Sequence, residues 1–288
     1  MIRWVLFSVI GTAALAGVSL IGKNTSPGQG AKEKEVQQQS DNETGTPFAV
    51  VELFTSEGCS SCPPADDLLG EIVKDAQKGQ QRVYCLSFHV DYWNSLGWRD
   101  PYSDPAFSRR QREYARAFKS DQVYTPQMVV NGSTGFVGSD RTRARKQIDA
   151  ALKQPVRAAV KLSQEQTKDA SSVVFAYEVR RAARGSALNV AVVEGGLVSK
   201  VKRGENGGRT LRHENVVQAL ETGLLGEAAT GTVQLKLPAD LVRKNSLAIA
   251  YVQDIDTWAI LGATAVELQP ADPPLAAEHS YAGRRTCQ

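Results

Sequence analysis

The sequence has little net charge, no phosphate-binding motif and no internal repeat. Its 34 lysines and arginines nearly balance 31 aspartates and glutamates, and the net charge of +3 is too small to indicate a nucleic-acid partner. Cysteine is scarce, with four residues in 288, so each one can be considered individually. With 42% hydrophobic and 23% charged residues, the composition is that of a soluble globular chain long enough for two domains.

Long apolar runs are also rare, and the exception lies at the N-terminus. Arg3 precedes an apolar run over residues 4–21, and Ala14-Leu15-Ala16 matches the small-x-small pattern of a signal-peptidase site. Residues 1–22 are therefore predicted to be a signal peptide, or a signal anchor if they are not cleaved. No cysteine follows at the position that a lipoprotein anchor needs. We expect a periplasmic or secreted protein that contacts a membrane only if this signal is retained.

Two segments are too polar to form a packed core. Residues 23–46 contain almost no large apolar side chain and are predicted to be a disordered linker. Residues 271–288 are polar and rich in proline and alanine, and we expect a flexible C-terminal tail that contains Cys287.

The first half of the remaining chain alternates between strand and helix patterns. The apolar strand runs have no polar alternation, as expected for strands covered on both faces. Asn131-Gly132 is a strong hairpin signal, and Asp140 can cap the helix that follows. The predicted elements are a strand at 48–55, a helix that starts at the C-x-x-C pair and ends at Gly79, a strand at 82–90, a helix at 105–119, strands at 127–130 and 134–137, and a helix after 140.

This order, with a C-x-x-C pair opening the first helix and Thr125-Pro126 before a hairpin, resembles the thioredoxin fold over residues 48–154. Four stretches resemble the bacterial family DUF1223 more specifically: VELFTSEGCSSCPP at 51–64, HVDYW at 89–93, YTPQ at 124–127 and RGEN at 203–206. The resemblance implies a secreted thioredoxin-like protein with a β-rich C-terminal extension. It also implies a cis peptide bond at Pro126, packed against the cysteines.

The second half, residues 155–270, has the period of two that is typical of half-buried strands. Short alternating runs separated by turn residues predict an all-β, sandwich-like domain. Residues 200–217 interrupt this pattern with many polar side chains, so they form either a loop packed towards the first domain or an internally hydrogen-bonded hairpin. The fold class predicted for the whole chain is thus an α/β thioredoxin-like domain followed by an all-β sandwich-like domain.

The cysteine pair suggests redox chemistry, because a thiolate at a helix N-terminus is stabilised by free N–H groups and the helix dipole. Cys59 is the predicted attacking sulfur and Cys62 the resolving one, acting on protein or small-molecule thiols and disulfides with no further cofactor. Two alternatives remain. The chain could be a non-catalytic interaction protein in which the pair is a static structural disulfide, or a metal-binding chaperone in which Cys59, Cys62 and His89 bind copper or zinc.

Several neighbouring side chains are candidates for supporting roles. Glu52, in the first strand, either moves the proton of the resolving cysteine, as the resemblance implies, or pairs with an arginine or a backbone amide. His89 and Asp91 follow the second strand and could face Cys59, or His89 could be hydrogen-bonded within its loop. Trp93 and Thr125 are candidate substrate contacts. Cys85 lies in an apolar strand and is predicted to be an inert buried thiol. A disulfide between Cys85 and Cys287 is a further alternative.

Overall fold

The computed structural model describes residues 45–167, 169–226 and 229–270. The predicted signal and tail, Cys287 and all but the last two residues of the predicted linker lie outside these ranges. Within the described residues the first half contains, in chain order, β1 (Ala49–Thr55), α1 (Pro63–Lys78), β2 (Val83–His89), a short 3-10 helix η1 (Asn94–Leu96), α2 (Pro105–Ala117), β3 (Gln127–Val130), β4 (Thr134–Val137) and α3 (Arg141–Ala151).

Local sequence signals account for the ends of these helices. Proline occupies the first two positions of α1, where the amides have no intrahelical acceptor, and Gly79 follows its last residue. The Asp104 side chain accepts a hydrogen bond from the N–H of Ala106 at 2.6 Å at the start of α2. Asp140 accepts from the N–H of Arg143 at 3.0 Å and caps α3 as predicted.

The second half is all strand apart from one short 3-10 helix. In chain order it contains β5 (Ala159–Glu165), β6 (Ser172–Arg180), β7 (Ser186–Glu194), β8 (Leu197–Lys200), β9 (Thr210–His213), β10 (Val216–Leu224), β11 (Thr230–Lys236), η2 (Arg243–Asn245), β12 (Ser246–Asp254) and β13 (Ile260–Glu267).

The two halves share one mixed sheet. Its strand order is β13-β12-β7-β10-β2-β1-β3-β4, and the junction is made by β10, which runs parallel to β2. There the N–H of Ser87 donates to the Asn215 carbonyl at 2.8 Å, and the Asn215 side chain donates to the Cys85 carbonyl at 3.0 Å. Three further strands form a small sheet in the order β11-β6-β5, and β8 and β9 form a separate hairpin.

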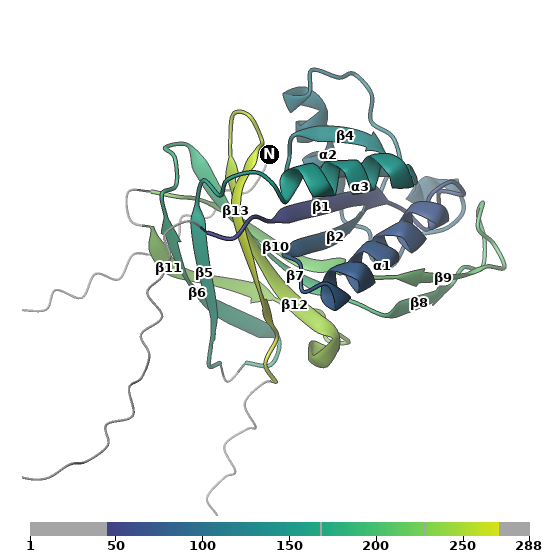
Figure 1. The fold of residues 1–288 in the computed structure, drawn as a ribbon. Coiled ribbons are helices and arrows are strands. Elements are labelled where there is room, and N and C mark those ends of the chain that lie inside the picture. The colour runs from purple at the N-terminus through teal and green to yellow at the C-terminus, as the bar shows by residue number, and fades with distance from the viewer. Residues whose placement is uncertain (1–44, 168, 227–228, 271–288) are drawn as a thin grey trace, which may run out of the picture.

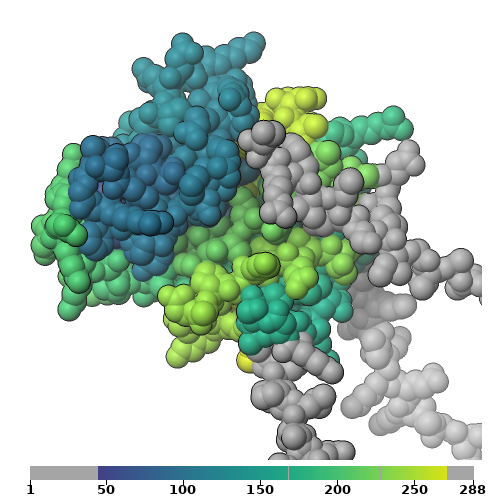
Figure 2. All heavy atoms as spheres, turned by 180° about the vertical axis from the view of Figure 1, so that it is seen from behind, coloured from purple at the N-terminus to yellow at the C-terminus, as the bar shows by residue number. Residues whose placement is uncertain are grey.

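The predicted fold class is therefore wrong. The described chain is mostly β, with three α-helices, and its central eight-stranded sheet takes strands from both halves instead of separating an α/β thioredoxin-like domain from a sandwich. The physical reason is the edge of β2, whose unpaired N–H and C=O groups are hydrogen-bonded by β10 from far along the chain. Figure 2 shows the blue N-terminal residues packed directly against green and yellow residues of the C-terminal half.

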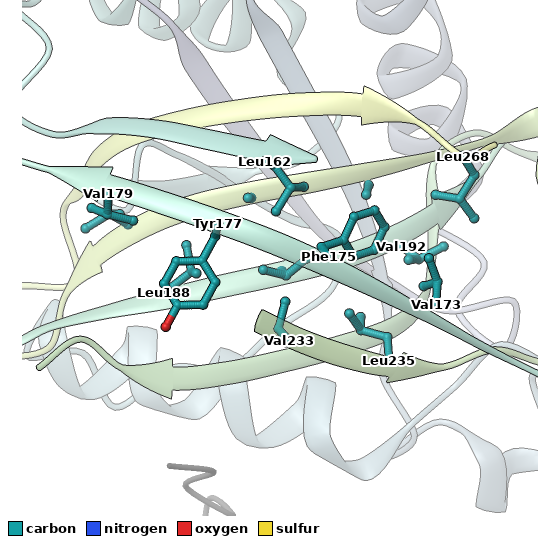
Figure 3. Packing of buried hydrophobic residues seen from close by; sticks show 14 of the residues in the cluster. Leu162, Val173, Phe175, Tyr177, Val179, Leu188, Val192, Val233, Leu235 and Leu268 are labelled. Carbon is teal, nitrogen blue, oxygen red and sulfur yellow. The ribbon is translucent and has the colours of Figure 1, made fainter. Parts of the chain in front are cut away.

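Both faces of the large sheet are covered (Figure 1). Helices α1 and α3 pack on the face of β1 that carries Val51 and Leu53, and α2 packs on the opposite face beside Phe54. Strand β7 is buried along its whole length, because one face joins the α2 core and the other packs against the small sheet. Figure 3 shows that second packing, in which Phe175 and Leu235 of the small sheet lie with Leu188 and Val192.

Candidate functional site

The two cysteines of the C-x-x-C pair form a disulfide where β1 leads into α1. The Cys59 N–H donates to the Ser56 carbonyl at 3.1 Å, and the Cys62 N–H donates to the Cys59 carbonyl at 3.2 Å. These turns bring the two Cα atoms to 5.4 Å, within the range that a disulfide requires. Cys62 immediately precedes α1, so Pro63 and Pro64 follow it at positions that offer no N–H donor.

Thr125, a candidate substrate contact, lies beside Cys59. The Thr125–Pro126 peptide bond is cis, as the resemblance implied, and the Thr125 carbonyl oxygen lies 3.9 Å from Cys59 Sγ. The indole N–H of Trp93 donates to the Thr125 hydroxyl at 2.8 Å. On the solvent side, the Ser61 hydroxyl is 3.3 Å from the same sulfur. Trp93, Thr125 and Pro126 are thus gathered beside the disulfide.

The loop between β8 and β9, residues 201–209, covers the disulfide. The Asn206 side-chain amide donates to the carbonyls of Glu57 and Cys59, each at 2.9 Å, and Asn206 is fully buried. The Glu205 carboxylate accepts from the Ser60 N–H at 2.9 Å. Cys59 and Cys62 have 0% exposed surface. Both predicted readings of residues 200–217 hold in part, because β8 and β9 form an internally hydrogen-bonded hairpin and the loop at its tip packs against the cysteine turn of the first half.

A buried group of ionisable side chains lies under the cysteine turn. This acid–histidine cluster consists of Glu57, Asp66, His89, Asp100 and His213. His89 Nδ1 is 2.7 Å from Asp100 Oδ2, and the same oxygen accepts from the Glu57 N–H at 2.8 Å. His213 Nε2 is 3.1 Å from Glu57 Oε1, and the two imidazole rings meet edge to face at 4.8 Å. The cluster joins the cysteine turn to β2, α1 and β9.

Burial and pairing move the pKa values in this cluster in opposite directions. Burial raises the pKa of Asp66 to about 7, and the nearby His213 opposes the shift only partly. Burial also acts to raise the pKa of Asp100, but His89 and the N–H groups of Glu57 and Tyr102 outweigh it and hold that pKa below its usual range. Asp66 therefore gains and loses a proton near neutral pH, whereas Asp100 stays ionised.

Some polar atoms of the cluster have no hydrogen-bond partner among the described residues. They are Asp66 Oδ1, His89 Nε2 and His213 Nδ1. His213 Nδ1 is 3.9 Å from Asp66 Oδ2, which is beyond hydrogen-bond reach. The two imidazole nitrogens and Asp66 Oδ1 are thus exceptions to the general pairing of buried polar groups, and all belong to the acid–histidine cluster.

Glu52 does not lie near the disulfide. Its side chain points to the face of β1 that α2 covers, opposite to α1, and its Oε1 accepts from Arg110 Nε at 2.7 Å. The Tyr114 hydroxyl also donates to this carboxylate, and the Arg110 guanidinium lies 5.3 Å from the Tyr114 ring centre. Glu52 is thus a buried ion-pair partner, and its predicted proton-transfer role is wrong because side chains alternate between the faces of a strand.

Two other predicted contacts have local partners. His89 is hydrogen-bonded within its loop through Asp100, the alternative that the sequence left open. The Asp91 carboxylate accepts from the Ser108 hydroxyl at the start of α2, and the Asp91 N–H donates to the same hydroxyl at 3.1 Å. Within residues 45–167, 169–226 and 229–270, no three His, Cys, Asp or Glu side chains are arranged to hold a metal ion. The geometry thus does not support a copper or zinc site built from Cys59, Cys62 and His89.

Cys85 is a free thiol in β2, and burial raises its pKa to about 12, which keeps it protonated and unreactive.

The sequence did not predict functional roles for four members of the acid–histidine cluster: Glu57, Asp66, Asp100 and His213. Asp66 had a usable signal, since it is an acid four residues after Cys62 in a helix whose other inward positions are apolar. Asn206 and His213 belong to the polar residues that interrupt the strand pattern at 200–217, but their partners could not be named from the sequence.

Comparison with known proteins places the chain in a family. The model of the family described as "Protein of unknown function (DUF1223)" matches residues 50–253. A search of the curated proteins finds no match. Among solved structures, a protein from Agrobacterium tumefaciens determined by a structural genomics consortium is 29% identical, with a TM-score of 0.57, and the match covers 78% of this chain and 96% of that one.

More distant structural matches carry no argument about function. A domain of the outer membrane lipoprotein Omp28 from Porphyromonas gingivalis is 15% identical, with a TM-score of 0.27, over 40% of this chain and 98% of that one. A β-glucuronidase from Ruminococcus gnavus is 14% identical, with a TM-score of 0.23, over 39% and 15%. The family model covers well over half of the chain and includes the disulfide, the cis proline and the covering loop. The chain belongs to the DUF1223 family.

Proposed function

We propose that the chain is a thiol–disulfide oxidoreductase in which Cys59 and Cys62 cycle between disulfide and dithiol. The observation that carries this proposal is the disulfide at the start of α1, beside the cis Thr125–Pro126 bond. A static disulfide would need only its two sulfurs. Here the turn is also held by Asn206 and connected to an acid–histidine cluster, which a purely structural cross-link does not require.

The reduced pair would transfer two electrons in two steps. The Cys59 thiolate attacks one sulfur of a substrate disulfide, forming a mixed disulfide while the other substrate sulfur leaves as a thiolate and takes a proton. Cys62 then gives up its proton and attacks Cys59 Sγ, which releases the second substrate sulfur and restores the Cys59–Cys62 disulfide. The substrate is reduced and the protein is oxidised, and the reverse sequence oxidises a dithiol substrate.

The geometry distinguishes the two sulfurs. Cys59 lies beside the exposed residues Ser60 and Ser61, so a substrate that reaches the pair meets this side first. Cys62 lies at the start of α1 with two prolines after it, where fewer amide hydrogens are available to stabilise a thiolate. Cys59 is therefore assigned the attack and Cys62 the resolution. Both sulfurs are covered, which favours a substrate that displaces the 201–209 loop over an arbitrary small thiol.

Redox titration tests the proposal directly. The full-length protein would be equilibrated with reduced and oxidised dithiothreitol, the thiols trapped with an alkylating agent and the two forms counted by mass. We expect reversible conversion of one disulfide, loss of that conversion in Cys59→Ser, and normal conversion in Cys85→Ala, which removes the other buried cysteine. If the pair stays oxidised after equilibration with excess dithiothreitol both in the wild type and in Asn206→Ala, which removes the hydrogen bonds that hold the 201–209 loop closed, the disulfide is structural and the proposal fails.

We also propose that the protein is exported, on the basis of the apolar run at residues 4–21 and the small-x-small pattern within it. In the part of the chain that the structure describes, no helix is long and apolar enough to cross a membrane. N-terminal sequencing of protein recovered from cell fractions would distinguish a cleaved signal from a retained anchor. Full-length protein in the cytoplasmic fraction would contradict export.

A further inference from the structure

A large groove lies between helix α2 and strands β10 and β11, and the turn joining β12 to β13 closes it. Its volume is about 1080 Å³, at the upper end of the range for small-molecule sites. None of the residues that line it belongs to the disulfide site or to the acid–histidine cluster. Whatever the groove binds is therefore independent of the proposed redox function.

The floor of this α2–β10 groove is polar, buried and already ordered. Arg110, Asn189 and Gln253 have 7%, 1% and 5% of their surface exposed. Gln253 Oε1 accepts a hydrogen bond from Arg110 at 3.1 Å, and the side-chain amide oxygen of Asn189, Oδ1, accepts one from the Thr222 hydroxyl at 2.8 Å. Since Glu52 neutralises the Arg110 charge, the floor orients a ligand through fixed dipoles without presenting an uncompensated buried charge.

One wall carries an aromatic residue in a strained conformation. Trp258 has a φ of +63°, a left-handed value that a bulky side chain rarely adopts. The surrounding contacts hold it there: its carbonyl accepts from Gln253 Nε2 at 2.7 Å, and its ring meets the Tyr114 ring edge to face at 4.8 Å. Residues kept in such conformations are concentrated at ligand-binding and catalytic sites.

Of the charged side chains that line the groove, the carboxylates have partners, whereas some of the cations form no ion pair among the described residues. Arg109, Arg112 and Lys236 form no ion pair with any carboxylate among the described residues. In contrast, the three carboxylates that line the groove, those of Glu113, Glu221 and Asp254, each have a partner. Glu113 pairs with Arg116, and Asp254 accepts hydrogen bonds from the N–H and hydroxyl of Thr257. The groove therefore offers free positive charge.

We propose that the α2–β10 groove binds an organic anion, a small molecule with a carboxylate or sulfonate group and a flat apolar body. Arg109 and Arg112 lie one turn apart on α2 and provide guanidinium donors for the anionic group. The indole of Trp258 and the half-buried side chain of Leu220 provide the apolar surface for the body of the ligand. Charge complementarity selects the anion, and the aromatic wall selects a flat molecule.

Anilinonaphthalene sulfonate is a suitable probe, because it combines a sulfonate with flat aromatic rings. In calorimetric titration of the folded protein we expect saturable binding of one equivalent. The double change Arg109→Ala, Arg112→Ala should weaken binding by about tenfold or more, since charge-assisted hydrogen bonds are lost. Arg145→Ala, which removes an exposed arginine from α3, is the matched control and should leave the affinity unchanged.

Three results would overturn the inference. They are absence of saturable binding, equal affinity in the double variant and the wild type, and equal loss of affinity in the Arg145→Ala control. Displacement of the probe by a short polyglutamate peptide but not by benzoate would show that the groove recognises acidic peptide, which would also refute the small-molecule class. Because Arg112 is exposed and Arg109 is half-buried, the double variant should keep the thermal unfolding midpoint of the wild type, and this midpoint is measured first.

Discussion

Replacing Asn206 with alanine should expose the disulfide to reductant. Its side-chain amide donates to the backbone carbonyls of Glu57 and Cys59, each at 2.9 Å, and the side chain is fully buried. Alanine has no donor, so both carbonyls lose their partner in the closed state. In an open state, water can hydrogen-bond to them. The substitution therefore shifts the equilibrium of the 201–209 loop towards opening.

The size of this shift follows from the two hydrogen bonds. A hydrogen bond contributes about 1 kcal/mol net, and somewhat more when a buried acceptor is left unpaired. Two bonds give about 2 kcal/mol, which corresponds to roughly a 30-fold increase in the population of the open loop. If dithiothreitol attacks only the open form, the reduction rate should increase by a similar factor. Glu205→Ala, which removes one exposed contact to Ser60, should increase it by no more than about threefold.

The assay is the pseudo-first-order rate of disulfide reduction by excess dithiothreitol, read by alkylation and mass, with the free energy of unfolding measured in urea. Asn215→Gly is the control for stability, because Asn215 donates to the Cys85 carbonyl, away from the disulfide, and has a φ of +50° that glycine tolerates. It should lower stability without accelerating reduction. A rate in Asn206→Ala within twofold of wild type, or equal acceleration in the control, would refute the reasoning.

Two further substitutions test the buried charges. Since the folded pKa of Asp66 is about 7 against 3.8 for an ordinary aspartate, the folded state retains a proton that the unfolded state releases, so stability falls as pH rises from about 4 to 7. In urea unfolding, Asp66→Asn should remove up to about 4 kcal/mol of this loss of stability between pH 4 and 8. Asp67→Asn, a change at an exposed neighbour, should leave the loss in place. If the free energy of unfolding depends on pH in the same way in Asp66→Asn and in the wild type, the reasoning is refuted. Glu52→Gln should leave the Arg110 charge unpaired and lower the free energy of unfolding by about 3 to 5 kcal/mol. The rate of disulfide reduction in the folded protein should not change, because Glu52 lies on the face of β1 away from α1. A decrease in stability below about 1 kcal/mol would show that the ion pair contributes little.

Local signals predicted most individual elements. The prolines after Cys62, the capping residue Asp140 and the Asn131-Gly132 turn each act within a few residues, so the helices and the β3–β4 hairpin lie where expected. Strand alternation likewise identified β6, β7, β11 and β12. The predicted fold class of two separate folds was wrong, because strands of the first half, which alternate with helices, and strands of the second half, which have the period of two, pair in one shared sheet. Pairing of β10 with β2 depends on which sheet edge is free after the first half folds, and no local pattern encodes that.

The sequence likewise predicted only those parts of the candidate site that depend on residue spacing along the chain. The cysteine pair, Thr125 and Pro126 were found because their spacing and order are visible in the chain. For Glu52 the sequence left proton transfer and pairing with an arginine open, because its charge was visible but the face of the strand was not, and that face decides whether it meets α1 or Arg110. His213 lies 156 residues from Glu57, and no sequence pattern links residues so far apart.

The sequence by itself determined the chemistry that is available here. Two cysteines at C-x-x-C spacing before a proline-opened helix can form a short-range disulfide, because only three peptide bonds separate them and their Cα atoms stay within reach. The tertiary structure decided how accessible that disulfide is and which charges surround it. Burial of Cys59 by Asn206, and the raised pKa of Asp66, arise only when β9 and its loop pack against α1, since desolvation depends on neighbours that meet through the fold and not through the chain.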